Sequence, residues 1–383
     1  MSIVKLVEKT AVLFDYFVSL IVSGYRYAFK GYRGEVPTYY EFVITTATTG
    51  DTCSDNNIDW SRLAGKTILV TGATGLIGQL LVKSLLNFGK VKIAAAVRNE
   101  EKALKLFGKN ENLTFIIGDI VNMPEINGHI DFIIHGASVT DSRMFVNNPV
   151  ETFVTALDGT RKMLELARNK KCESMVYLSS MEVYGAPETD EKISETAATN
   201  LNTMAVRSCY PESKRACENL CCAYASEYNV PVKAVRLTQT FGSGVKYDDD
   251  RVFAEFARCA VEGRDIILHT KGETKRNYLY VSDAVRAILT VLLNGENGTA
   301  YNAANEETYC SIYEMAHLVA DNCADGKIDV KCIVEDTAKF GYAPILKMNL
   351  DTSLLRSLGW RAETGLSEMY KRMIAAWNFD SKE

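Results

Sequence analysis

The chain has 383 residues, a net charge of −5 at pH 7, and Lys and Arg residues that are spread along its length. This length can bury a large core in one or two domains, and an acidic balance without a basic patch argues against a nucleic-acid partner. The ten cysteines include no Cys-x-x-Cys pair, and none of the four histidines has metal-ligand spacing to a cysteine. We therefore expect reduced thiols in a cytoplasmic protein and no metal site.

The first 60 residues differ in pattern from the rest of the chain. Residues 11–23 form an apolar stretch that is too short to span a bilayer and contains an aspartate, and no secretory cleavage site follows it. A helix docked on the main body or on a second subunit is the favoured interpretation. A helix on a membrane surface, supported by the basic residues that follow, is the alternative. We expect residues 34–60 to form an irregular connector.

A glycine turn follows the apolar run Ile68–Val70. Gly72, Gly75 and Gly78 are spaced by three residues, and an apolar helical pattern begins at the end of the turn. This order binds the pyrophosphate of a dinucleotide, because glycine lets the backbone approach the phosphates and the helix N-terminus offers free N–H groups. The predicted cofactor contacts in this turn are Gly72, Thr74, Gly75, Leu76, Ile77 and Gly78.

From residue 65 onward, short apolar strands alternate with longer helical stretches. The predicted strands are 91–97, 113–117, 131–135, 174–178 and 232–237, and the clearest predicted helices are 149–169 and 211–228. This alternation predicts an α/β fold with a doubly wound parallel sheet of the Rossmann type, which binds ligands at the carboxyl ends of its strands. We predict three regions: a helical extension with a connector (1–60), an NAD(P)-binding domain with the catalytic residues (61–240), and a smaller substrate-binding lobe with segments that return to the first domain (241–383).

Further cofactor contacts are predicted where the strands end. Arg98 follows the second strand about 20 residues after Gly78, where an acidic side chain would bind the ribose of NAD and an arginine could hold the 2′-phosphate of NADP. The choice between NAD and NADP therefore stays open, with NAD favoured. We expect Asp119 and Ile120 at the adenine end, and Ala137 and Ser138 at the nicotinamide side.

The predicted catalytic groups lie on the next strand and helix. Ser180 follows the strand 174–178, and Tyr210 and Lys214 are four residues apart on a helix, so they share one face. An ammonium group beside a phenol favours the phenolate, which makes Tyr210 a general base for a substrate hydroxyl. Ser180 can share the hydrogen bond to that hydroxyl, and Tyr210 and Lys214 are also predicted to contact the cofactor.

From residue 65 to about 376, the chain resembles the extended short-chain dehydrogenase/reductases, in the NAD-dependent epimerase/dehydratase group that modifies nucleotide sugars. The resemblance rests on segments 71–78, 179–185, 210–214, 236–242 and 276–283. In particular, the chain resembles the UDP-glucuronate decarboxylases. They share its Glu-Val-Tyr-Gly sequence, its Cys-Tyr-x-x-x-Lys-Arg helix, and an arginine five residues before Val-Ser-Asp.

The resemblance implies roles for individual residues. Ser180 is expected to contact the substrate hydroxyl, and Glu182 to act as an acid or base, with a helix-capping glutamate as the structural alternative. Tyr210 and Lys214 serve the oxidation step, and Arg276 binds the diphosphate or the sugar acid. Further substrate contacts are predicted for Gln239, which replaces a family asparagine, and for Arg251, which could instead pair with the acidic run before it.

The resemblance also implies a reaction class: decarboxylation of a nucleotide-linked uronic acid through a 4-keto intermediate, with tightly bound NAD and a homodimeric enzyme. An epimerase acting at C4 or C5 is the alternative. A 4,6-dehydratase is disfavoured because Met181 stands where that enzyme carries an aspartate. A reductase that releases its cofactor, and a cofactor-binding sensor or scaffold, are further alternatives. The intact Ser180, Tyr210 and Lys214 argue against the sensor or scaffold.

Overall fold

The computed structural model describes residues 58–198, 200–334 and 345–380. Almost all of the predicted extension at 1–60, including the apolar stretch 11–23, lies outside the described residues, so its predictions stay predictions. Within the described ranges, no helix is both long enough and apolar enough to cross a membrane.

Seven parallel strands form the central sheet, in the order β10-β6-β5-β4-β1-β2-β3. The strand order reverses beside β1, which has β2 on one side and β4 on the other, and doubly wound sheets bind their ligands at such a switch point. This sheet confirms the predicted fold class. Its strands are β1 (Thr67–Thr71), β2 (Lys92–Val97), β3 (Leu113–Ile117), β4 (Phe132–His135), β5 (Ser174–Ser180), β6 (Val232–Leu237) and β10 (Ala300–Ala303).

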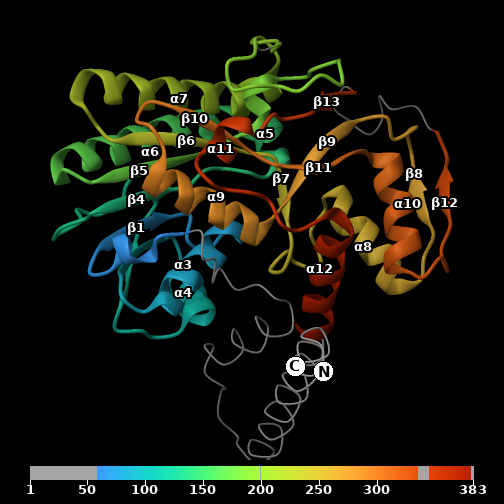
Figure 1. The fold of residues 1–383 in the computed structure, drawn as a ribbon, viewed down its shortest axis with the longest axis horizontal. Coiled ribbons are helices and arrows are strands. Elements are labelled where there is room, and N and C mark those ends of the chain that lie inside the picture. The colour runs from blue at the N-terminus through green and yellow to red at the C-terminus, as the bar shows by residue number, and fades with distance from the viewer. Residues whose placement is uncertain (1–57, 199, 335–344, 381–383) are drawn as a thin grey trace, which may run out of the picture. The chain divides into compact units, whose positions relative to one another are not determined.

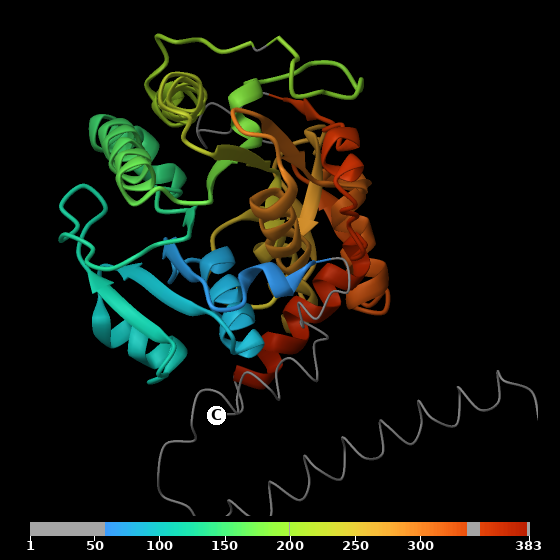
Figure 2. The same ribbon diagram turned by 60° about the vertical axis from the view of Figure 1, so that its left-hand side comes forward.

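Helices cover both faces of this sheet (Figure 1, Figure 2). On one face, α6 (Pro149–Lys170) and α7 (Cys209–Tyr228) pack against each other and against the central strands. On the other face, α3 (Leu76–Phe88) packs beside α9 (Val281–Asn294). Because both faces are covered, central strands such as β4 are fully buried, which explains their continuous apolar sequences. The shorter helices α4 (Glu100–Phe107) and α5 (Ser142–Asn147) contact β3 and α6, respectively.

A second, smaller set of strands and helices follows β6. The strands β7 (Gln239–Phe241), β9 (Lys275–Tyr280), β11 (Asn305–Ser311) and β13 (Lys347–Met348) form one sheet, and β8 (Ile266–Leu268) pairs with β12 (Val330–Cys332). The helices α8 (Val252–Glu262), α10 (Ile312–Cys323) and α12 (Leu366–Asp380) pack together, and α11 (Ser353–Ser357) contacts β10. Stacked rings of Phe241 and Phe253, with centroids 4.6 Å apart, form part of this core. The domain boundary near residue 240 stays a prediction.

The connection from β5 to α7 runs through two short 3₁₀ helices, η2 (Met181–Tyr184) and η3 (Val206–Ser208). The segment between η2 and η3 contacts the smaller sheet through ion pairs and a backbone hydrogen bond. The Asp190 carboxylate contacts the Lys347 and Lys275 ammonium groups at 2.7 and 3.3 Å. The Ile193 N–H donates to the Asn349 carbonyl at 2.7 Å. This connection therefore fixes η2 and the start of α7 relative to both parts of the molecule.

Candidate active site

The glycine turn has a backbone that accepts only glycine at two positions. Gly72 has φ +72°, and a Cβ atom there would lie 2.7 Å from the carbonyl carbon of Gly136, which follows β4. A Cβ atom on Gly78 would lie 2.2 Å from the Gly72 carbonyl oxygen, because α3 packs directly on the turn. α3 begins after Gly75 without a side-chain cap, so its first N–H groups can bind a phosphate. The turn therefore fits a dinucleotide, and Thr74, Leu76 and Ile77 lie partly exposed on it.

The ends of β1 and β4 are tied together beside this turn. The Ala137 N–H donates to Thr71 Oγ1 at 3.1 Å, and the same oxygen lies 2.7 Å from His135 Nδ1. Burial, together with the charge of Lys214, lowers the pKa of His135 to about 3, so its ring is neutral near pH 7. Ser138 follows, half-buried, at the position expected for the nicotinamide side. The stretch 135–138 was expected at the nicotinamide side, but the contact between His135 and Thr71 could not be predicted from the sequence.

The residues predicted for the adenine end follow two neighbouring strands. Arg98, after β2, and Asp119, after β3, are both exposed. The Asp119 carboxylate accepts the N–H of Val121 at 2.9 Å. Ile120 is buried against α6, where a Cβ atom on Gly159 would lie 3.0 Å from its side chain. The structure thus places Arg98 and Asp119 at the sheet edge that carries the glycine turn, and their cofactor contacts stay predictions.

Ser180 and Tyr210 meet at the carboxyl end of β5. Ser180 is the last residue of the strand, and its Oγ accepts the N–H of Glu182 at 3.2 Å. Tyr210, in the first turn of α7, is buried and stacks on Phe145 of α5 with ring centroids 4.2 Å apart. The Ser180 hydroxyl lowers the pKa of the Tyr210 phenol through hydrogen bonding. Two residues that are distant in the sequence thus lie close together at the end of β5.

Lys214 lies one helical turn after Tyr210 and is almost fully buried. Its Nζ donates to the Leu178 carbonyl at 2.8 Å and lies 5.7 Å from the centroid of the Tyr210 ring. Burial lowers the pKa of Lys214 to about 8, while Glu218 acts in the opposite direction. The ammonium group is therefore held beside the phenol ring, as the spacing of the two residues predicts.

A bidentate ion pair stands next to this site. Arg207 of η3 donates to both carboxylate oxygens of Glu182, at 2.9 and 3.2 Å. Burial raises the pKa of Tyr210, and the negative charge of Glu182 raises it further, whereas the Ser180 hydrogen bond and Arg207 lower it. Arg207 was not predicted from the sequence, where its only signal is a cation three residues before Tyr210.

The predicted substrate residues differ in how they are engaged. Arg276 lies in β9, and its buried Nε has no hydrogen-bond partner among the residues that the structure describes. Gln239 begins β7 and pairs with Tyr278 of the same β9 strand. Arg251 donates from Nε and Nη2 to both oxygens of Asp249, at 2.8 and 2.6 Å. Arg276 therefore offers an unmet donor, whereas Arg251 would have to leave Asp249 in order to bind a phosphate.

Comparison with known sequences places this arrangement in context. The model of the NAD dependent epimerase/dehydratase family matches residues 68–304. UDP-glucuronic acid decarboxylase 1 of Xenopus tropicalis is 30% identical over 312 residues, which cover 81% of this chain and 71% of that protein. UDP-glucuronic acid decarboxylase 2 of Arabidopsis thaliana is 29% identical over 313 residues, which cover 81% of this chain and 68% of that protein.

Solved structures share the fold. UDP-glucose 4-epimerase of Thermotoga maritima, determined with UDP-glucose, matches with a TM-score of 0.70 and 19% identity, and the match covers 83% of this chain and 100% of that chain. dTDP-glucose 4,6-dehydratase of Bacillus anthracis, in complex with NAD, matches with a TM-score of 0.68 and 20% identity, covering 83% of this chain and 98% of that chain.

Proposed function

Because this chain belongs to the NAD-dependent epimerase/dehydratase family, we propose that it decarboxylates a nucleotide-linked uronic acid, such as UDP-glucuronate, through a 4-keto intermediate. The observation that carries the proposal is the cluster of Ser180, Tyr210 and the Glu182–Arg207 pair at the end of β5. The named function of the relatives at about 30% identity supports the same substrate class.

The glycine turn and the ends of β1 and β4 would hold the cofactor, with Lys214 and Tyr210 beside its reactive end. When bound, NAD supplies the acceptor for a hydride from sugar C4 and returns that hydride at the end of the cycle. Tyr210 accepts the proton of the C4 hydroxyl, and Ser180 orients that hydroxyl by a shared hydrogen bond. Lys214 and Arg207 supply the positive charge that favours the phenolate form of Tyr210.

The ketone at C4 makes the C5 carboxylate a β-keto acid. The bond between C5 and the carboxylate carbon breaks, carbon dioxide leaves, and the electron pair moves into an enolate that is protonated at C5. Glu182 is the acid or base candidate for this later stage, because its carboxylate lies beside Tyr210 and is held by Arg207. Arg276 is the proposed partner of the diphosphate or the sugar acid, since its buried Nε lacks a partner among the described residues.

Met181 argues against water elimination. Its side chain is buried, and its Sδ accepts a hydrogen bond from the Thr238 hydroxyl at 3.3 Å. A thioether has no proton to give to a departing C6 hydroxyl. The surroundings of Met181 therefore favour decarboxylation or epimerisation over a 4,6-dehydratase reaction.

Mass spectrometry of the products tests the proposal. The purified protein is incubated, without added cofactor, with a panel of nucleotide sugars that includes uronic acids, and the Tyr210→Phe variant serves as the inactive control. Loss of carbon dioxide from a uronic acid supports the proposal. Loss of water, or turnover at unchanged mass, would replace it with a dehydratase or an epimerase.

A homodimer in the cytoplasm completes the proposal. Val150 and Val154, one turn apart on α6, are 74% and 45% exposed, and Val146 on the separate helix α5 is also exposed. Apolar side chains at four-residue spacing on one helix form the kind of stripe that buries itself against a second copy. The cytoplasmic location is supported by the described cysteines, all of which are free thiols.

A further inference from the structure

One face of α7 carries three ionisable residues at four-residue intervals. Tyr210 and Lys214 are the first two, and Glu218 is the third, two turns after Tyr210. Residues four apart on a helix lie one above the other, so the Glu218 carboxylate extends the line that begins at the Tyr210 hydroxyl. The proposed reaction assigns a role to the first two residues and none to Glu218.

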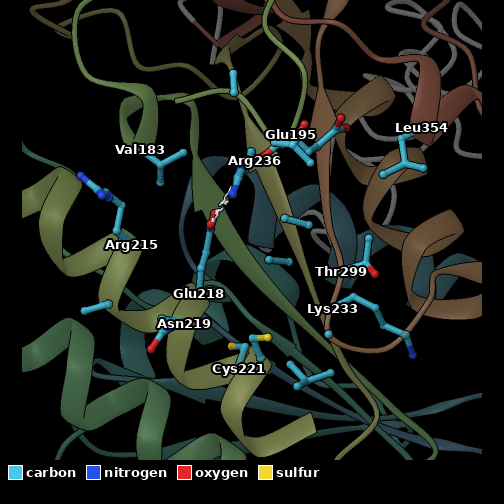
Figure 3. Close-up of a pocket in the computed structure, with 18 of the residues that line it drawn as sticks. Val183, Glu195, Arg215, Glu218, Asn219, Cys221, Lys233, Arg236, Thr299 and Leu354 are labelled. Atoms are coloured by element: carbon cyan, nitrogen blue, oxygen red, sulfur yellow. Dashed lines mark hydrogen bonds and ion pairs between the residues drawn. The ribbon is translucent and has the colours of Figure 1, made fainter. Parts of the chain in front are cut away.

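The Glu218 carboxylate is held by side chains from two neighbouring strands, β5 and β6. Ser179 of β5 donates its hydroxyl to Oε1 at 2.5 Å. Arg236 of β6 donates from Nε at 2.9 Å and from Nη2 at 2.7 Å. Only 12% of the Glu218 side chain and 14% of the Arg236 side chain are exposed. Figure 3 shows this ion pair among the residues that line a pocket of about 790 Å³, whose walls come mainly from α7, β6 and the start of β10.

Arg236 extends the network to the connection between β5 and α7. Its Nη1 donates to the Tyr184 hydroxyl at 2.7 Å and to the Glu195 carbonyl at 2.8 Å. Ser179 directly precedes Ser180, so the network joins the strand end that carries Ser180 to the helix that carries Lys214. The carboxylate cannot move without breaking contacts with both strands.

We propose that Glu218 is a positioning residue for the oxidation step: it fixes α7 against β5 and β6 and supplies the buried negative charge that keeps Lys214 an ammonium ion. The catalytic effect of Glu218 rests on the proposed function, whereas its effect on the charge of Lys214 does not.

Among the residues that the structure describes, Glu218 is the one carboxylate that acts on the pKa of Lys214. The others are thiols and aromatic rings, which offer no full negative charge at neutral pH. Burial lowers the pKa of Lys214 and the Glu218 carboxylate opposes that effect, so removing Glu218 should lower this pKa further, and a neutral amine does not stabilise a phenolate. The groups around the Lys214 ammonium are Glu218, Cys217, Cys221, Tyr210, Tyr177 and His135.

The Glu218→Gln variant tests the charge while keeping the shape and the hydrogen bond from Ser179. Lys214 loses its proton as the pH rises through its pKa, so the variant is expected to lose the ammonium ion at lower pH than the wild type. The alkaline limb of cofactor reduction, followed by NADH absorbance after addition of the nucleotide uronic acid, should move down by about 1 pH unit. A rate that falls equally at every pH would overturn the proposal and leave Glu218 a purely structural role.

Two further variants separate charge from packing. Glu218→Asp keeps the negative charge, so the alkaline limb of its pH profile should lie at the same pH as in the wild type. Ser179→Ala removes one hydrogen bond but no charge, so its limb should not move. A Ser179→Ala limb that shifts as far as that of Glu218→Gln would overturn the proposal.

A measurement without substrate keeps this inference separate from the proposed function. The ¹³Cε resonance of Lys214, assigned by its loss in Lys214→Met, is titrated by NMR in the full-length wild-type protein and in Glu218→Gln. A lower midpoint in the variant supports the proposal, and an unchanged midpoint overturns it. If no nucleotide uronic acid reduces the cofactor in the wild type, the proposed function fails while this titration still decides the role of Glu218.

Discussion

The Glu182–Arg207 pair shows how one ion pair bears on two stages of the proposed reaction. The carboxylate raises the pKa of Tyr210, and the guanidinium lowers it. Glu182→Gln keeps the side-chain size and one acceptor for Arg207 but removes the negative charge. We expect C4 oxidation to continue, with its acid limb at lower pH, while the later step slows and reduced cofactor accumulates. Stopped-flow absorbance of the reduced cofactor checks this, and equal loss of both steps would mean that Glu182 is only structural.

The buried ammonium group of Lys214 lowers the free energy of unfolding of the protein. Its pKa falls from 10.5 to about 8 on folding, so the unfolded chain holds the proton more tightly than the folded protein. Below pH 8 the burial penalty is fully present, at about 3 kcal/mol, and it fades as the pH rises towards 10.5.

We therefore expect Lys214→Met to be inactive yet more stable by up to about 3 kcal/mol at pH 7, less the value of the lost hydrogen bond to Leu178. Denaturant unfolding of both cofactor-free proteins at pH 7 and pH 10 measures the difference. The gain should shrink at pH 10. A gain that stays constant between the two pH values would show that the buried charge is not its source.

At the scale of single elements, the packing of α3 on the glycine turn is the most exacting contact. A Cβ atom on Gly78 would lie 2.2 Å from a backbone oxygen, whereas one on Gly365 would meet nothing within 4 Å. Gly78→Ala must push α3 away from the turn, at a cost of about 1–3 kcal/mol, and should release bound NAD. Gly365→Ala is the matched control and should retain the cofactor. Cofactor content after purification and the thermal midpoint report both effects, and full NAD occupancy in Gly78→Ala would contradict the close packing.

The strands of the central sheet could be predicted wherever both faces are buried. Strand 131–135 agrees with β4, all four residues of which are buried, because burial between two helical layers favours an apolar run. Strand 113–117 agrees with β3 through its apolar sequence, although β3 lies at the edge of the sheet and is only partly buried. β10 could not be predicted in this way. Its sequence is only four residues long and includes Asn302, whose side chain accepts from Tyr184 and donates to the carbonyls of two distant segments.

In the candidate site, contacts within one element could be predicted from the sequence, whereas contacts between distant elements could not. Spacing along a single helix or turn predicted that Tyr210 would lie beside Lys214 and that the glycines would pack closely. The Arg207 ion pair and the Phe145 ring under Tyr210 arise where the chain returns to itself from other elements. The contacts of Glu218 with Ser179 and Arg236 also join different elements. No local sequence pattern predicts contacts of this kind.

At the scale of the whole molecule, the exposed valines of α5 and α6 predict self-association. We expect the double variant Val150→Glu, Val154→Glu to convert a dimer into a monomer, because burying two carboxylates in an apolar contact is unfavourable. Light scattering coupled to gel filtration measures the mass. Val261→Glu alters a valine of α8 that is 39% exposed, and this control should leave the dimer intact. A double variant that keeps the wild-type mass would place the interface elsewhere.

The place of β10 at the edge of the large sheet affects how the protein is made. Residues 300–303 pair with β6, so that strand keeps an open hydrogen-bonding edge on the ribosome until about 60 further residues have been synthesised. An open, apolar strand edge is a template for pairing with other chains. A fragment that stops near residue 240 would carry the glycine turn and the Tyr210 helix and yet keep that edge permanently. Such a fragment should aggregate during expression unless a peptide that supplies β10 is provided with it.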